Sequence, residues 1–408
     1  MGARQLEGIR VLDLSRVLAG PLTGQLLGDL GAEVIKVERP GSGDESREYG
    51  PPFLKCNNID TDRSAFYVSA NRNKKSITLD LASTRGQEIA RGLADRADIL
   101  IENFRVGVLA KYGLDYAALS TRNPNLIYCS ITGYGQSGPY RNRPGYDSIF
   151  QAMSGLMDSI GYPDHEPRGG PMRTGPSITD VLTSLYADSA ILAALYARDA
   201  RGGGGEHIDM ALLDSAIAAT SHYASSYLVS RKVPQRRGNE GNGGVPSRVF
   251  RCADGSIILT VGNDAQFGRF CQAIQQPDLI TDGRFASGPD RIVNRDALNA
   301  ILEAIFETRS VGIWLDLLVG AEVPVGPIYS FAETFADRHV RERGIEVRAN
   351  LGDGLDVPLI ASPIRYRNRP IETYSAPPTL GEHTDSILRE LLGFSDDSIE
   401  KLRRDQII

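Results

Sequence analysis

The chain has 408 residues, with 45 Lys and Arg against 51 Asp and Glu, so its formal net charge is −6. This length predicts two or three domains, or one large fold with an insertion, and it allows a sizeable core. The mildly acidic balance gives no electrostatic footprint for nucleic acid or an anionic membrane, so neither partner is expected. Glycine is the outlier at 43 residues, which indicates tight turns or close backbone approaches.

The first third of the chain alternates between strand-like and helix-like segments. Strands are expected at 10–14, 32–38, 76–81, 98–104 and 126–135, and helices at 19–31 and 84–97. This alternation predicts an α/β fold with a parallel sheet and helices on both faces. The layout is Rossmann-like, but the first loop lacks the GxGxxG fingerprint, which argues against a dinucleotide oxidoreductase.

The rest of the chain changes character. A long helix is expected at 177–200, ended by four glycines at 202–205, and a second long helix at 211–230. Alternating residues around Asp254-Gly255 predict a hairpin. A smaller domain is expected at 238–337, followed by a strand at 359–367 and a last helix at 383–393.

Several functional classes lack their motifs. The four cysteines form no CxxC pair and the five histidines no HxxxH spacing, which disfavours a disulfide framework and a metal site. There is no GxSxG elbow. The segment Gly41–Asp44 reads as a turn and not as a P-loop. No signal peptide or 20-residue apolar run is recognised, so we expect a cytoplasmic protein.

Asp180 is the most informative carboxylate, at the expected start of the long helix. Ser177-x-x-Asp180 fits a capping box, in which Asp180 closes the first turn. The same position also suits a nucleophile, because a helix N-terminus lowers a carboxyl pKa and keeps the group ionised. The local pattern leaves both interpretations open.

Basic residues form a weaker signal. Arg39, Arg72, Lys74, Lys75 and Lys111 are expected at or near the carboxyl ends of strands, or in the loops beside them. Ligands bind at that edge of open α/β sheets, so these cations can hold phosphates. Taken singly, each also fits a solvated surface charge.

Together, the motifs resemble one known family. LEGIRVLDLSRVLAGPLTGQLLGDLGAEVIKVERPGSGD, NRNKKSITLDL, IENFRVGVLAKYGL, CSITGYGQSGP, PGYDSIFQAMSGLM, GPSITD and CADGSIILTVGNDAQF are similar to segments of the family III CoA-transferases, in the same order. That superfamily includes formyl-CoA and carnitine CoA-transferases. Within it the chain most resembles succinyl-CoA:dicarboxylate transferases of the glutarate type.

The resemblance implies an architecture and a mechanism. A large Rossmann-like CoA-binding domain is built from 1–220 and the returning segment 345–408, with the small domain between, and two subunits interlock as a homodimer. Asp180 becomes the nucleophile, carrying anhydride and aspartyl-CoA intermediates. Gly243 and Gly244 belong to a glycine loop, 241–244, that closes over it. CoA and acyl-CoA act as substrates, with no permanently bound cofactor or metal.

The resemblance also implies the residues that contact CoA and the substrate. They are Val17, Leu18, Ala19, Arg39, Arg72, Asn73, Lys74, Asn103, Phe104, Lys111, Tyr112, Arg143, Tyr146 and Asp147.

Three positions depart from related enzymes. Leu18 stands where the formyl-CoA enzyme has glutamine, and Pro144 replaces a lysine, with Arg143 beside it. Tyr146-Asp147 stands where 2-methylacyl-CoA racemases carry His-Asp, so one of their two bases is missing. We expect succinyl-CoA as donor and glutarate, malate, itaconate or a larger succinate derivative as acceptor, bound by Arg72, Arg143 or Arg173. A racemase and a non-catalytic subunit of a heteromeric transferase remain as alternatives.

Overall fold

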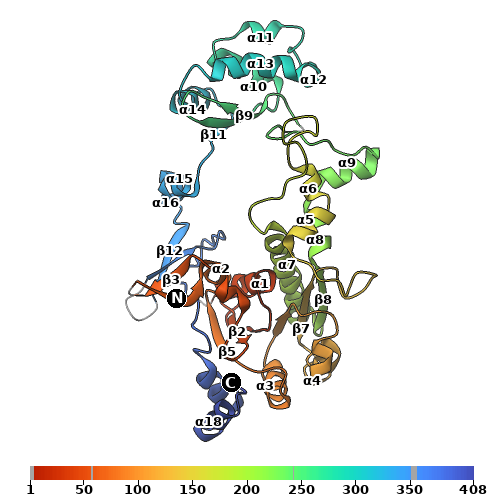
Figure 1. Cartoon of the computed structure of the whole chain (residues 1–408), viewed down its shortest axis with the longest axis vertical. Helices are drawn as coiled ribbons and strands as arrows, with labels where there is room; N and C mark the ends of the chain where they lie inside the picture. The colour runs from red at the N-terminus through yellow and green to blue at the C-terminus, as the bar shows by residue number, and fades with distance from the viewer. Residues whose placement is uncertain (1–3, 57, 242, 351–355) are drawn as a thin grey trace. The chain divides into compact units, whose positions relative to one another are not determined.

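The computed structural model describes residues 4–56, 58–241, 243–350 and 356–408. Two compact units make up the chain (Figure 1). Unit 1 contains Met1–Leu156, Arg173–Ser230 and Arg341–Ile408, and unit 2 contains Met157–Met172 and Arg231–Val340. The expected small domain at 238–337 falls inside unit 2, which also takes in the excursion at 157–172.

Unit 1 is built on a six-stranded parallel sheet in the order β5-β2-β1-β6-β7-β8. Its strands are β1 (Arg10–Asp13), β2 (Glu33–Glu38), β5 (Lys74–Thr78), β6 (Ile99–Glu102), β7 (Ile127–Thr132) and β8 (Glu206–Ala211). Two antiparallel hairpins accompany it, β3 (Phe53–Cys56) with β4 (Ile59–Ser64), and β12 (Glu346–Asn350) with β13 (Asp356–Ile360).

Helices cover both faces of this sheet. One face carries α3 (Thr84–Ala94), α4 (Tyr116–Arg122), α17 (Thr384–Leu392) and α18 (Asp396–Arg404). The other carries α1 (Ala19–Asp29), α5 (Asp147–Met153), α7 (Ile178–Arg201) and α8 (Leu212–Ala219). The remaining helices of unit 1 are η1 (Glu45–Glu48), α2 (Ala65–Ala70), η2 (Leu109–Tyr112) and α9 (His222–Ser230).

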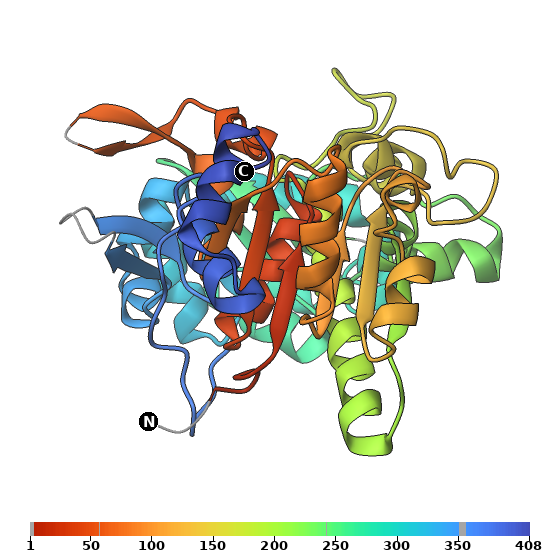
Figure 2. The same ribbon diagram turned by 90° about the horizontal axis from the view of Figure 1, so that it is seen from below.

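The two faces follow from the alternation of side chains along each strand. In β1, Val11 packs on the α1 and α7 side, while Leu12 packs on the α3 and α17 side. Figure 2 shows the C-terminal helices, in blue, lying across the sheet with α3 in orange. Both ends of the chain therefore contribute to the core of unit 1.

Unit 2 has its own core around Trp314. A three-stranded sheet combines β9 (Ser247–Arg251), β10 (Ser256–Thr260) and β11 (Val325–Pro327). The helices are α10 (Asp264–Ala273), α11 (Asp278–Thr281), α12 (Gly288–Val293), α13 (Arg295–Phe306), α14 (Val311–Gly320) and α15 (Phe331–Ala336). Two short helices, α6 (Leu156–Ser159) and α16 (Arg338–Glu342), span the boundaries between the units.

The structure confirms the parallel sheet and the hairpin at Asp254-Gly255, and it corrects other expectations. The helix expected at 211–230 is two helices, because Ser221 adopts a left-handed φ of 45° between α8 and α9. The strand expected at 359–367 ends at Ile360, and a further helix, α18, follows the expected last one.

Helix α7 is the one described helix that is long and apolar enough to cross a membrane by length and composition. One such helix is weak evidence, since core helices pass the same test. Here α7 contacts α1, α5, α8, β7 and β8, as expected of a helix that covers a sheet.

Candidate active site

The strand order reverses between β1 and β6, and this is where open parallel sheets bind their ligands, outside the carboxyl ends of the strands. The turn after β1 meets the loop after β6 at that point. The Asn103 side chain accepts the Arg16 N–H at 2.9 Å and donates to the Arg16 carbonyl at 2.7 Å. The Arg16 guanidinium lies over the Phe104 ring, 5.5 Å from its centroid. The structure thus brings the turn containing Val17 and Leu18, just before Ala19 begins α1, together with Asn103 and Phe104.

Asp180 lies half-buried in the first turn of α7. In the described part of the chain its carboxyl group has no hydrogen-bond or salt-bridge partner, and the charged group that acts on it is Asp147. Burial, followed by repulsion from Asp147, raises the pKa of Asp180 to about 7. Asp180 therefore keeps its proton to a higher pH than an ordinary carboxyl group does.

Asp147 performs the capping that the sequence pattern assigns to Ser177 and Asp180. Its Oδ1 accepts the Thr179 N–H at 2.8 Å and the Thr179 hydroxyl at 2.6 Å, while Oδ2 accepts from Gln151 at 2.6 Å. Ser177 makes no capping bond with its side chain. The capping-box interpretation is wrong, because an acid from α5 already satisfies the helix start.

The expectation that the helix start lowers the pKa of Asp180 is also wrong, because the local pattern leaves out tertiary contacts. Partial positive charge at a helix start lowers a carboxyl pKa by a modest amount. Desolvation and a neighbouring acid act in the opposite direction, and here they dominate.

Tyr146 lies at the start of α5 and is 69% exposed. Burial raises the pKa of Tyr49, and Glu45, Tyr146 and Asp44 add to that rise. Tyr49 is thus within electrostatic reach of both Tyr146 and the carboxylate of Asp44, which bonds the turn after β1.

Three predicted CoA contacts, Arg72, Asn73 and Lys74, lie at the amino end of β5, as does Lys75. The expected position at or near a carboxyl end is therefore wrong for the cations Arg72, Lys74 and Lys75. Arg72 holds Asp29 with two bonds of 2.9 and 2.5 Å, and Asn73 donates to the same carboxylate at 2.8 Å. The buried Lys74 ammonium lies 2.9 Å from Asp13, and burial lowers the pKa of Lys74 to about 8. All three have partners within the fold, and their contact with CoA stays a prediction.

Four other predicted contacts are spread over the surface of unit 1. Arg39 directly follows the carboxyl end of β2 and is exposed. Lys111, in η2, is also exposed, and Tyr112, the last residue of η2, is half-buried. Arg143 is exposed and stacks on the Tyr140 ring, 3.6 Å from its centroid. Their roles in binding stay predictions.

Comparison with known proteins identifies the family. The sequence model of CoA-transferase family III matches residues 6–384. The chain belongs to CoA-transferase family III. It is 44% identical to a succinate–glutarate CoA-transferase of Agrobacterium fabrum over 95% of each chain. It is 34% identical to a succinyl-CoA–D-citramalate CoA-transferase of Chloroflexus aurantiacus, over 99% of this chain and 98% of that one.

A solved structure agrees with this placement. A CAIB/BAIF family protein from Brucella suis matches with a TM-score of 0.85 and 42% identity, covering 96% of this chain and all of that one. The chain is therefore a CoA-transferase with the fold of that family.

The predicted glycine loop of the transferase lies in unit 2, just before β9. A side chain at Gly244 would place its Cβ 2.4 Å from the Val261 carbonyl oxygen, whereas Gly243 faces open space. Asn242, between them and Gly241, lies outside the described residues. The closure of this loop over Asp180 stays a prediction.

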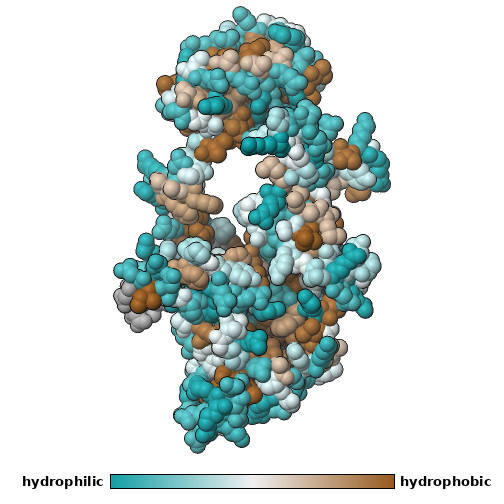
Figure 3. All heavy atoms as spheres, viewed as in Figure 1, coloured by the Kyte–Doolittle hydropathy of each residue, from teal (hydrophilic) through white to brown (hydrophobic). Residues whose placement is uncertain are grey.

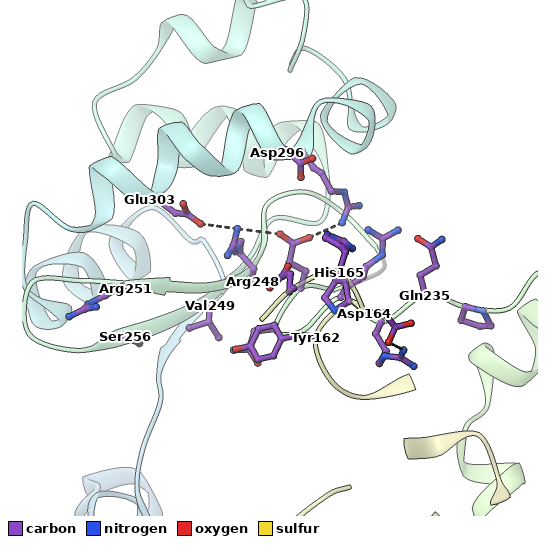
Figure 4. A pocket seen from close by; sticks show the side chains of 18 of the residues that line it. Tyr162, Asp164, His165, Gln235, Arg248, Val249, Arg251, Ser256, Asp296 and Glu303 are labelled. Carbon is purple, nitrogen blue, oxygen red and sulfur yellow. Dashed lines mark hydrogen bonds and ion pairs between the residues drawn. The ribbon is translucent and has the colours of Figure 1, made fainter. Parts of the chain in front are cut away.

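Unit 2 also contains a polar cavity of about 1010 Å³ (Figure 4). Some of its acids and bases pair with one another: Arg248 lies 3.0 Å from Glu303, and both Arg248 and Arg295 bond Glu240. None of the predicted site residues lines this cavity. This cavity is therefore not part of the predicted site.

Sequence reasoning missed two buried acids beside the turn. Asp44, in the segment taken for a plain turn, accepts the Val17 N–H. Glu102, the last residue of β6, accepts the Phe104 N–H at 2.8 Å, and burial raises the pKa of Glu102 to about 7. Their position in the sequence could have predicted them, because each acid lies at or after the carboxyl end of a central strand, where ligands bind.

Proposed function

We propose that the transferase moves CoA from succinyl-CoA to a short dicarboxylic acid, with Asp180 as the nucleophile. The supporting observation is the environment of Asp180, a half-buried carboxyl at a helix start whose capping duty Asp147 has taken over. Its oxygens are left without a partner among the described residues, as an attacking group requires. The names of the relatives supply the donor and the class of acceptor.

The proposed reaction proceeds through covalent intermediates. An Asp180 oxygen attacks the thioester carbonyl, the C–S bond breaks, and CoA leaves as a thiolate with a mixed anhydride on the enzyme. The thiolate attacks the aspartyl carbonyl of that anhydride, which releases the donor acid and forms an aspartyl-CoA thioester. The acceptor carboxylate then reverses both steps and regenerates Asp180. Backbone N–H groups can stabilise the oxyanion of each tetrahedral step.

The second carboxylate of the acceptor needs a cation. Arg72 is engaged by Asp29, whereas Arg143 and Arg173 are exposed and can each form a forked hydrogen bond with a carboxylate. We therefore assign this contact to Arg143 or Arg173. Replacing the responsible arginine with methionine should raise the KM of the acid and leave that of succinyl-CoA within about threefold.

We further propose a cytoplasmic homodimer of interlocked subunits that uses CoA esters as substrates and holds no resident cofactor. Exposed apolar side chains support the dimer. On α9, Tyr227, Leu228 and Val229 are 42%, 60% and 89% exposed, and Figure 3 shows hydrophobic residues gathered over this helix. A second copy of the chain would cover such a surface.

Purified protein should transfer CoA from succinyl-CoA to at least one acid in a panel of glutarate, malate and itaconate, measured by mass spectrometry of CoA esters. The proposal fails if no acid accepts CoA. Succinyl-CoA alone should leave a hydroxylamine-sensitive adduct on wild type and none on Asp180→Ala. Deuterium entering the α-carbon without an acceptor acid would instead indicate a racemase, and activity only with a second subunit would indicate the scaffold alternative.

A further inference from the structure

Val17 adopts a backbone conformation that β-branched residues rarely take. Its φ is +70°, in the left-handed region, where a valine costs of order 1–3 kcal/mol. Such a strained conformation persists only where surrounding contacts hold it in place, and it occurs most often at functional sites. The residues that hold Val17 in place are therefore candidates for a functional role.

A buried ion pair provides that hold. Both oxygens of Asp44 accept the Val17 N–H at 3.2 Å, and the Lys36 ammonium donates to the Ser15 carbonyl at 2.8 Å. Lys36 and Asp44 lie 2.8 Å apart, and both side chains are 0% exposed. One pair thus anchors the turn on both sides of Arg16.

The same turn packs tightly against the helix that follows it. A Cβ on Gly20 would lie 2.3 Å from the Ser15 Cβ, so the start of α1 folds directly back onto Ser15. The Asn103 side chain holds the Arg16 backbone from the β6 loop. The turn is therefore fixed from three neighbouring segments.

Both members of the pair are charged in the folded protein. Burial opposes ionisation of each, but Asp44, Asp13 and Glu38 together raise the pKa of Lys36. Lys36 and the bonds from Ser46 hold the pKa of Asp44 well below its usual range. Buried ion pairs add little net stability compared with apolar residues of similar size, so stability alone does not account for this one.

We propose that Lys36 and Asp44 are positioning residues that hold the Ser15–Leu18 turn in the shape that receives the thioester arm of acyl-CoA. This inference rests on the proposed function. The turn lies at the switch point of the sheet, beside Asn103 and Phe104. Because a displacement of about 1 Å can reduce a reaction rate about 100-fold, the pair acts mainly on alignment and thus on kcat.

The test replaces both charges at once, because a single replacement leaves an unpaired buried charge. The double variant Lys36→Met/Asp44→Leu replaces both charged groups with apolar side chains and removes both anchors of the turn. Its kcat should fall at least tenfold, while the KM for succinyl-CoA changes less than threefold. The control, Leu93→Ala on the buried face of α3, should lose stability and keep its kcat.

Two further measurements separate positioning from a general structural role. Adding Val17→Gly to the double variant should recover at least threefold in kcat, because glycine adopts a positive φ without strain. Hydrogen exchange should show the Val17 amide protected in wild type and exposed in the double variant. A double variant with kcat within threefold of wild type, or a Val17 amide unprotected in wild type, would overturn the proposal. A different outcome would reject only the proposed function: the wild-type protein transfers no CoA, yet the Val17 amide is protected in wild type and exposed in the double variant.

Discussion

Replacing Asp180 by asparagine should abolish CoA transfer and stabilise the protein. The unfolded chain ionises this carboxyl at its ordinary pKa of 3.8, and the folded chain only at a pKa of about 7. At about 1.4 kcal/mol per pH unit, ionising Asp180 in the folded state costs about 4 kcal/mol. Asparagine has nearly the same shape and no charge, so the variant avoids this cost.

The sign of the pH dependence follows from proton binding. Between pH 4 and 7 the folded state holds more of the Asp180 proton than the unfolded state, so this group makes stability fall as pH rises. The advantage of Asp180→Asn should therefore be small near pH 4, grow up to pH 7, and level off above it. Urea unfolding of both proteins at pH 5, 6, 7 and 8, at one protein concentration, measures this difference.

A matched control comes from the same helix. Asp188 is buried, neither of its carboxyl oxygens has a hydrogen-bond partner among the described residues, and burial, then Asp29, raise the pKa of Asp188 to about 9. Asp188→Asn should also stabilise the protein at pH 7, but with kcat unchanged. If the stability curves of wild type and Asp180→Asn run parallel from pH 5 to 8, the reasoning about Asp180 is refuted.

Two further predictions concern the surroundings of the site. Asp147→Asn removes a negative charge beside Asp180 and keeps an oxygen for capping α7, so the pH profile of kcat/KM should shift toward lower pH. An unchanged profile would contradict a charge effect. Gly244→Ala should lower the urea midpoint, because its Cβ would lie 2.4 Å from the Val261 carbonyl oxygen, while Gly243→Ala should not. Equal midpoints for the two variants would show that this close approach is absent.

The sheet was predictable because its signals are local. The central strands of a parallel sheet are buried on both faces and appear as short apolar runs, as at 98–104 and 126–135. The break between α8 and α9 was not predictable in this way. Apolar residues continue through 211–230, and only the left-handed conformation of Ser221 separates the helices. Strand β5 begins two residues before its expected start, but Arg72 precedes the strand in either case, so its place at the amino end was already implied by the sequence.

The candidate site shows the limit of local patterns more clearly. The local pattern singled out Asp180 and the family resemblance implied its role, but its capping and its pKa were both mispredicted from the adjacent residues. The deciding contact joins Asp147 to Thr179 across 32 positions of sequence. A helix start looks the same in sequence whether its N–H groups are capped locally or from another helix. Tertiary contacts therefore decide whether the acid in the first turn is free to react.

Carboxylates inside unit 1 have two kinds of environment, one with a neighbouring cation and one without. Asp13, Glu38 and Asp44 each have a buried cation within 3 Å, namely Lys74, Arg47 and Lys36. These cations occupy the oxygens of their acids, which suits groups that hold backbone in place. A buried cation beside Asp180 would keep this carboxyl group ionised, but it would also engage the lone pairs that must attack a thioester. Without a cation, Asp180 lowers the stability of the fold but keeps its oxygens available for attack. The gain in stability and the loss of CoA transfer expected for Asp180→Asn therefore have one physical cause.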